Sequence, residues 1–175
     1  MKSVDADVPE VLVTEESFEV FYEREFHQVA ALAFVLCGSW SAAEDLAQDA
    51  FVAAQRRWAV VGRYDRPEAW VRRAVANRSV SLTRRRLAEA RALLRQSRER
   101  WTDPAAFDDG DGEFWDTVRS LPARQRQVIS LHYVNSLSVK EIASTLDLSE
   151  ATVKTHLQRG RRSLELKLTD RSKQS

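Results

Sequence analysis

Residues 138–168 read SVKEIASTLDLSEATVKTHLQRGRRSLELKL, and this stretch decides the fold of the C-terminal part of the chain. Ser138 followed three residues later by Glu141 predicts a capping box that opens a helix. A three-residue turn begins at Asp147, a residue type that tolerates left-handed backbone, and Ser149 predicts the cap of a second helix. Two helices joined in this way are typical of a helix-turn-helix.

The second helix of this motif has one apolar and one polar face. Val153, Leu157, Leu164 and Leu168 recur at helical spacing and are expected to face inward. The second helix of such a motif enters the major groove of DNA. The residues predicted to meet base edges and phosphates are Ser149, Glu150, Ala151, Lys154, Thr155, Gln158, Arg159 and Arg162. An ordinary helical hairpin with a basic surface is the alternative, but it leaves the agreement of caps, turn and outward polarity unexplained.

Upstream, the sequence predicts a separate helical unit. Apolar residues recur every three or four positions from Phe18 to Leu36, until Gly38 ends the pattern. Ser41 followed by Glu44 predicts a capping box for the next helix. Its inward residues are Ala47, Ala50, Phe51, Ala54 and Trp58, and its opposite face carries Asp45, Gln48, Asp49 and Arg56.

A third helix of this unit is rich in arginine. The stretch from Ala59 to Arg66 is predicted to be a loop, with Asp65 as N-cap and Pro67 in the first turn of the helix. The buried face is Trp70, Val71, Ala74 and Val75, and a second face carries Arg73, Asn77, Ser81 and Arg84, flanked by Arg72, Arg85 and Arg86. Charge runs are usually solvated faces. Here the arginines have few acidic residues near them in the sequence, and a tryptophan and an asparagine lie among them. This pattern favours contact with phosphates and stacking on nucleobases.

Composition supports an all-α fold with no catalytic or metal chemistry. Only five glycines and four prolines are spread over 175 residues. Residues 56–100 carry fourteen bases against four acids, and 101–116 carry six acids and no base. Two basic units separated by an acidic joint suggest two nucleic-acid contacts. The acids Asp108, Asp109, Asp111 and Glu113 lack the spacing of an EF-hand, so neither a metal nor a cofactor is expected.

Other function classes are disfavoured by what the sequence lacks. No nucleophile with a base, glycine-rich phosphate loop or pair of carboxylates is visible, so no catalytic residue is predicted and the chain is not expected to be an enzyme. The acidic N-terminus has neither the basic nor the apolar segment of a secretory signal, and no apolar run is long enough to cross a membrane. A cytoplasmic protein is expected, and Cys37 alone cannot form an internal disulfide.

Three segments resemble sigma-70 family sigma factors of the extracytoplasmic-function (ECF) type. SAAEDLAQDAFVAAQRRW resembles region 2.2, PEAWVRRAVANRSVSLTRRR resembles regions 2.3 to 2.4, and LPARQRQVISLHYVNSLSVKEIASTLDLSEATVKTHLQRGRRSLELKL resembles region 4. The short acidic stretch at 101–116 stands where larger sigma factors have a folded region 3. One departure is Ser81, where many members have aspartate.

The resemblance implies a role for each unit. Asp45, Gln48, Asp49 and Phe51 would dock on the clamp helices of the largest subunit of core RNA polymerase, whose flap is a further contact. A surface of Val60, Arg63, Tyr64, Arg66, Trp70, Arg73, Asn77, Arg84 and Arg85 would capture the melted minus-ten element. The helix-turn-helix would read the minus-thirty-five element of promoter DNA as duplex. The resemblance also implies an anti-sigma factor as a partner.

The expected organisation is therefore two small helical domains joined by a flexible acidic linker. The predicted boundaries are a disordered extension at 1–14, region 2 at 15–88, a linker at 89–112 and region 4 at 113–170.

Two other classes of binding protein compete with this interpretation. The segment LSEATVKTHL also resembles the output domain of LuxR-type regulators, but the N-terminal half shows no βα-alternating receiver. A pure interaction protein leaves the two basic, aromatic-bearing surfaces unexplained.

Overall fold

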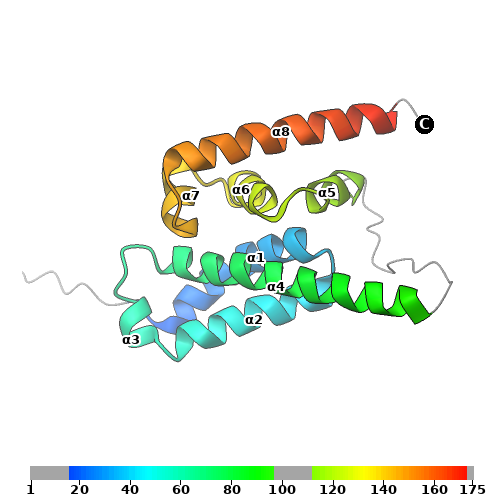
Figure 1. Cartoon of the computed structure of the whole chain (residues 1–175). Helices are drawn as coiled ribbons and strands as arrows, with labels where there is room; N and C mark the ends of the chain where they lie inside the picture. The colour runs from blue at the N-terminus through cyan, green and yellow to red at the C-terminus, as the bar shows by residue number, and fades with distance from the viewer. Residues whose placement is uncertain (1–15, 97–111, 173–175) are drawn as a thin grey trace, which may run out of the picture.

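The structure, a computed structural model, describes residues 16–96 and 112–172, and that part of the chain is helical throughout (Figure 1). The helices are α1 (Phe18–Cys37), α2 (Trp40–Gln55), α3 (Trp58–Val61), α4 (Pro67–Gln96), α5 (Gly112–Arg119), α6 (Ala123–Tyr133), α7 (Val139–Leu146) and α8 (Glu150–Ser172). The predicted all-α fold is confirmed. The predicted extension at 1–14 and most of the linker lie outside the described residues.

In the N-terminal unit, α1 packs against α2 and α4 around an aromatic centre. The ring of the fully buried Phe21 lies 5.7 Å from that of Phe51 and 4.8 Å from that of Trp58, between ring centroids. Helix α1 ends at Gly38, as predicted, where a φ of 78° is left-handed backbone that glycine adopts without steric cost. These contacts fix the positions of α2 and α4.

The predicted capping box at Ser41 is wrong, because α2 begins two residues earlier. The N-cap is Ser39, whose backbone is extended and whose hydroxyl accepts a hydrogen bond from the amide of Ala42 at 3.5 Å. Trp40 therefore lies inside the helix, where its ring stacks on Phe34 with centroids 4.5 Å apart. The local spacing of Ser41 and Glu44 favours a later start of α2, and the tertiary contact of Trp40 with Phe34 favours the earlier start that is observed.

Two further boundaries differ from the predictions. The expected loop after Trp58 contains a short helix, α3, that ends at Gly62. Helix α4 begins at Pro67, so the N-cap position falls on Arg66 and not on Asp65, and its guanidinium Nε donates to Glu68 Oε1 at 3.0 Å. Helix α4 also continues to Gln96, past the predicted linker start at residue 89, because residues 89–96 are strong helix formers without glycine or proline.

The C-terminal unit contains the predicted helix-turn-helix. Both arms of the capping box are present, since the Ser138 hydroxyl accepts from the amide of Glu141 and the Glu141 carboxylate accepts from the amide of Ser138. Asp147 is left-handed with φ 57°, and the Ser149 hydroxyl accepts from the amide of Thr152 at 3.1 Å. These three local predictions are confirmed.

The two units pack against each other through α1 and α4 on one side and α5, α6 and α7 on the other (Figure 1). The Gln127 side-chain amide donates to the backbone carbonyl of Ala76 at 2.6 Å, and the Asn135 amide donates to the carbonyl of Gln28 at 3.2 Å. Helix α2 lies on the side away from the C-terminal unit, and α8 forms the opposite outer surface (Figure 1). The main contacts between the units are thus those of α1 with α5 and α6 and those of α4 with α7.

Candidate nucleic-acid and polymerase interfaces

Three of the four predicted polymerase-docking residues form one exposed face of α2. Asp45, Gln48 and Asp49 are exposed, and Gln48 and Asp49 follow Asp45 by three and four residues, so the three lie on the same side of the helix; we call them the α2 face. Phe51 is a correction, because it is only 2% exposed and its ring packs against Phe21. It supports the helix from within and has no surface to offer a partner.

The α2 face borders a pocket of about 500 Å³ between α2 and α4. The pocket is lined by Ala42, Asp45, Leu46, Asp49, Arg78, Ser81, Leu82 and Arg85. Asp49 Oδ2 lies 3.7 Å from Arg78 Nη1, which makes an exposed ion pair between the two helices. Arg78 was not among the predicted site residues, because pairing between helices leaves no spacing signal in the sequence. The structure thus brings acidic and basic groups together where the α2 face meets α4.

Helix α4 carries three of the nine predicted minus-ten residues, Trp70, Arg73 and Asn77, on one side. Arg73, Asn77 and Ser81 are exposed and follow each other at four-residue steps, and the half-buried Trp70 lies three residues before Arg73 on the same side; we call these four residues the α4 stripe. Arg85 is also exposed, whereas the side chain of Arg84 lies outside the described residues. The stripe presents a guanidinium, an amide and part of an indole, which suits phosphate contact and base stacking.

Arg72, which the sequence placed beside this basic face, is buried instead. Its Nη2 donates to Glu25 Oε2 of α1 at 2.8 Å, and the two side chains are 6% and 11% exposed. Burial lowers the pKa of Arg72, and the Glu25 carboxylate opposes that shift. The pair fastens α4 to α1 and so orients the α4 stripe on the other side of the helix.

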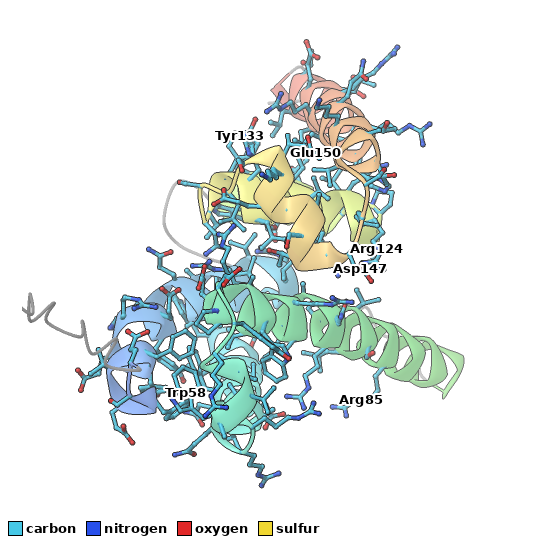
Figure 2. All side chains as sticks on the ribbon, turned by 90° about the vertical axis from the view of Figure 1, so that its left-hand side faces the viewer. Trp58, Arg85, Arg124, Tyr133, Asp147 and Glu150 are labelled. Carbon is cyan, nitrogen blue, oxygen red and sulfur yellow. The ribbon has the colours of Figure 1, made fainter. Side chains whose placement is uncertain are left out.

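Helix α3 and the loop after it project apolar and aromatic side chains. Val60 is 56% exposed and Tyr64 48% exposed, and Arg63 is exposed beside them. Trp58 anchors this segment in the aromatic centre (Figure 2), and a Cβ on Gly62 would lie 3.0 Å from the Trp58 carbonyl oxygen. The predicted base-capture residues therefore lie on a short, tightly packed turn.

Two cations of the predicted minus-ten surface pair with the C-terminal unit. Arg66 Nη2 lies 3.0 Å from Glu141 Oε1, and Arg73 Nη2 lies 3.4 Å from Asp147 Oδ2. Asp147 lies on the side of the C-terminal unit that faces α4 (Figure 2). Hydrogen bonds from Ser138 lower the pKa of Glu141, and the charge of Arg66 adds to this shift.

The recognition surface of α8 is exposed as predicted. Val153, Leu157 and Leu164 are buried, and a Cβ on Gly160 would lie 2.8 Å from Ile129 Cγ1, so α8 packs closely on α6. We call the predicted duplex-reading residues the α8 face; all of them are exposed, namely Ser149, Glu150, Ala151, Lys154, Thr155, Gln158, Arg159 and Arg162. Burial, Arg159 and Arg124 together lower the pKa of His156, which favours a neutral imidazole near this face.

The described part of the chain was searched for metal-holding clusters and for membrane-spanning helices. Residues 16–96 and 112–172 contain no group of three or more His, Cys, Asp or Glu side chains placed to hold a metal ion. Asp108, Asp109 and Asp111, considered above for metal binding, lie outside the described residues. None of the described helices is both long and apolar enough to cross a membrane.

Two family descriptions match the chain in the expected order. "Sigma-70 region 2" matches residues 21–89 and "Sigma-70, region 4" matches residues 111–164. The first match covers the N-terminal unit with the α2 face and the α4 stripe. The LuxR-type alternative is therefore not favoured, because it accounts only for the C-terminal unit.

Three curated relatives with similar sequences are sigma factors. The chain is 30% identical to the RNA polymerase sigma-E factor of Streptomyces avermitilis, covering 74% of this chain and 72% of that protein. It is 28% identical to the ECF RNA polymerase sigma factor SigW of Bacillus subtilis, covering 85% and 86%. It is also 28% identical to the ECF sigma factor SigE of Mycolicibacterium smegmatis, covering 85% of this chain but 60% of that protein.

Solved structures show the same fold. The sigma factor RpoE, crystallised with the anti-sigma factor NepR from Bartonella quintana, superposes with a TM-score of 0.67 at 22% identity, covering 87% of this chain and 96% of that one. CnrH, solved in complex with the cytosolic domain of CnrY, gives a TM-score of 0.62 at 25% identity, covering 87% and 88%. Because both sigma-70 regions match in order and the relatives named above are sigma factors, this chain belongs to the sigma-70 family as an RNA polymerase sigma factor of the ECF type.

Proposed function

We propose that the α2 face docks on the clamp helices of core RNA polymerase while the α4 stripe and the α3 turn hold the melted minus-ten element. The observation that carries this proposal is the position of the two surfaces on α2 and α4, which pack against each other in one unit. Arg72 and Glu25 set the rotation of α4, so that its stripe keeps a fixed relation to the α2 face. Docking on polymerase would then also place the DNA-holding surface.

The minus-ten role follows from the chemistry of the exposed groups. Tyr64 and Trp70 offer aromatic surface on which an extruded base can stack, Asn77 offers an amide for a base edge, and Arg73 offers a guanidinium for phosphate. Arg63, Arg66 and Arg85 add positive charge around them. The surface therefore offers groups that can bind both the unpaired bases and the phosphate backbone of the melted strand.

The α8 face is proposed to read the minus-thirty-five element as duplex DNA. Its N-terminal end carries Glu150, Lys154 and Gln158 toward the solvent, in the arrangement by which a recognition helix reaches base edges. Arg159 and Arg162 extend the face with charges suited to flanking phosphates.

We further infer that an anti-sigma factor controls this protein. We also infer that this protein acts in the cytoplasm, where it would bind RNA polymerase. The support is that two similar chains were solved as complexes, one of them with an anti-sigma factor. The protein itself performs no catalytic step; polymerase carries out RNA synthesis.

Run-off transcription with purified core polymerase of the source organism, on a pooled library of its promoters, tests the proposal. Discrete new start sites that require this protein are the expected result, and they would also reveal both promoter elements. Absence of new start sites, together with absence of binding to core polymerase, would overturn the assignment of the α2 face.

A further inference from the structure

The C-terminal unit places two carboxylates on the surface proposed for minus-ten DNA. Arg66 pairs with Glu141 at 3.0 Å and Arg73 pairs with Asp147 at 3.4 Å. The two acids stand at opposite ends of α7, which packs on α4. A guanidinium that pairs with a carboxylate presents the same N–H groups that it would present to a phosphate.

Both carboxylates are held in place by the local fold of the helix-turn-helix. Glu141 Oε2 accepts the hydrogen bond from the Ser138 amide at 2.7 Å, which leaves Oε1 for Arg66. Asp147 ends α7 in left-handed backbone and so directs its side chain from a fixed turn. The positions of the two negative charges are thus determined before the units meet.

The contact between the units engages some of the proposed binding surfaces and not others. Alongside the two ion pairs it contains the hydrogen bonds from Gln127 to Ala76 and from Asn135 to Gln28. All four contacts fall on α1, α4 or the residue before α4, whereas the α2 face and the α8 face stay exposed. These polar groups can exchange their partners for water when the units separate, whereas the buried apolar residues that the two units share in one cluster hold them together.

We propose that α7 is a built-in competitor of promoter DNA: Glu141 and Asp147 occupy Arg66 and Arg73 in place of the phosphates of the melted strand. The units must separate before those arginines engage DNA. This inference rests on the proposed function of the α4 stripe. Because the α2 face is exposed in the closed arrangement, polymerase can bind first and DNA can then replace α7.

The test is the double variant Glu141→Gln, Asp147→Asn in the full chain. Glutamine still completes a capping box and asparagine tolerates left-handed backbone, so the helix-turn-helix is retained. The control Glu165→Gln, Asp170→Asn removes the same charge from two exposed positions of α8. Fluorescence anisotropy measures binding to a short, labelled, random-sequence single strand, and small-angle scattering measures the radius of gyration.

The double variant is expected to bind the single strand at least about threefold more tightly than the control and to have a larger radius of gyration. Adding Arg73→Ala to the double variant should abolish the gain. Equal binding by the double variant and the control would overturn the inference, because the gain would then reflect net charge alone.

Two further outcomes separate the inference from the proposed function. Expansion without tighter binding would mean that the α4 stripe is not a DNA surface, which overturns both. Neither expansion nor tighter binding, in a protein whose promoter opening still depends on Asn77, would overturn the competitor role of α7 and leave the proposed function standing.

Discussion

Arg72 and Arg73 are adjacent in the sequence yet serve different purposes. Arg72 is buried against Glu25, and Arg73 is exposed on the α4 stripe. Successive helical residues point in directions about 100° apart, so one arginine reaches α1 while the next reaches the other side of α4. Charge alone therefore identified a basic helix without showing which of its arginines meet DNA.

Glu25→Gln is expected to destabilise the protein by about 3 kcal/mol, because it leaves the Arg72 guanidinium buried without a counter-charge. The control Glu23→Gln changes an exposed residue of the same helix and should shift stability by less than about 0.5 kcal/mol. Urea denaturation followed by circular dichroism measures both. If both variants lowered the free energy of unfolding by an equally small amount, water would have to reach Arg72 and replace the contact with Glu25.

Gly160→Ala is expected to destabilise the C-terminal unit, although alanine favours helix more than glycine by about 1 kcal/mol. The added methyl group would lie 2.8 Å from Ile129 Cγ1, and overpacking of this kind costs about 1–3 kcal/mol. Thermal unfolding should show a lower midpoint than wild type, while Glu165→Ala on the exposed side of α8 should not. A raised midpoint would mean that α6 and α8 move apart without cost.

At the level of elements, caps were predictable where the deciding geometry is local. Ser138, Asp147 and Ser149 were assigned correctly, because a cap joins residues only two or three positions apart. At the start of α2 either Ser39 or Ser41 could serve as the N-cap. Ser39 does so in the structure, where Gly38 is left-handed and Trp40 stacks on Phe34. Such contacts have no counterpart in a single stretch of sequence.

The capping box of α7 is expected to weaken in acid. The pKa of Glu141 is lowered in the folded state, so its contribution is fully present above the ordinary value of 4.5 and is lost as the pH falls through the lower, folded value. Nuclear magnetic resonance of the Ser138 amide across this range reports the loss of its hydrogen bond. In Glu141→Gln the same amide should show no such transition, and a transition there would assign it to another group.

Arg159→Ala tests α8 as the duplex-reading element. Loss of one base or phosphate contact is expected to weaken binding to the minus-thirty-five duplex about tenfold. Lys167→Ala, an equal change of charge roughly two turns further along α8, is the control. Footprinting of the polymerase complex on promoters found by run-off transcription measures both, and equal weakening would move the recognition surface away from the N-terminal end of the helix.

At the level of the whole molecule, the existence of two helical units was predictable and their packing was not. Gln127 and Ala76 are 51 residues apart, and Asn135 and Gln28 are 107 apart. Hydrophobic spacing reports on the face of one helix and carries no information about polar contacts over such separations. The packing of the two units, and with it the pairing of Arg73 with Asp147, therefore emerged only from the structure.

Asn77→Ala is expected to lower the rate of promoter opening about tenfold while leaving affinity for core polymerase unchanged, since Asn77 lies on α4 and not on the α2 face. The control is Gln55→Ala at the exposed end of α2. Permanganate footprinting measures opening, and competition between labelled sigma factors measures core affinity. A parallel loss of both would assign Asn77 a structural role.

Asp147 ends α7 in a backbone conformation for which glycine is the usual residue. A glycine there would keep the turn and the reading of duplex DNA, but it would remove the carboxylate that holds Arg73. A single base change converts an aspartate codon to a glycine codon, so one mutation would weaken the proposed restraint and leave only the Arg66–Glu141 pair. If low basal transcription is selected, aspartate should be retained at position 147 among related sequences, although glycine would fold equally well there.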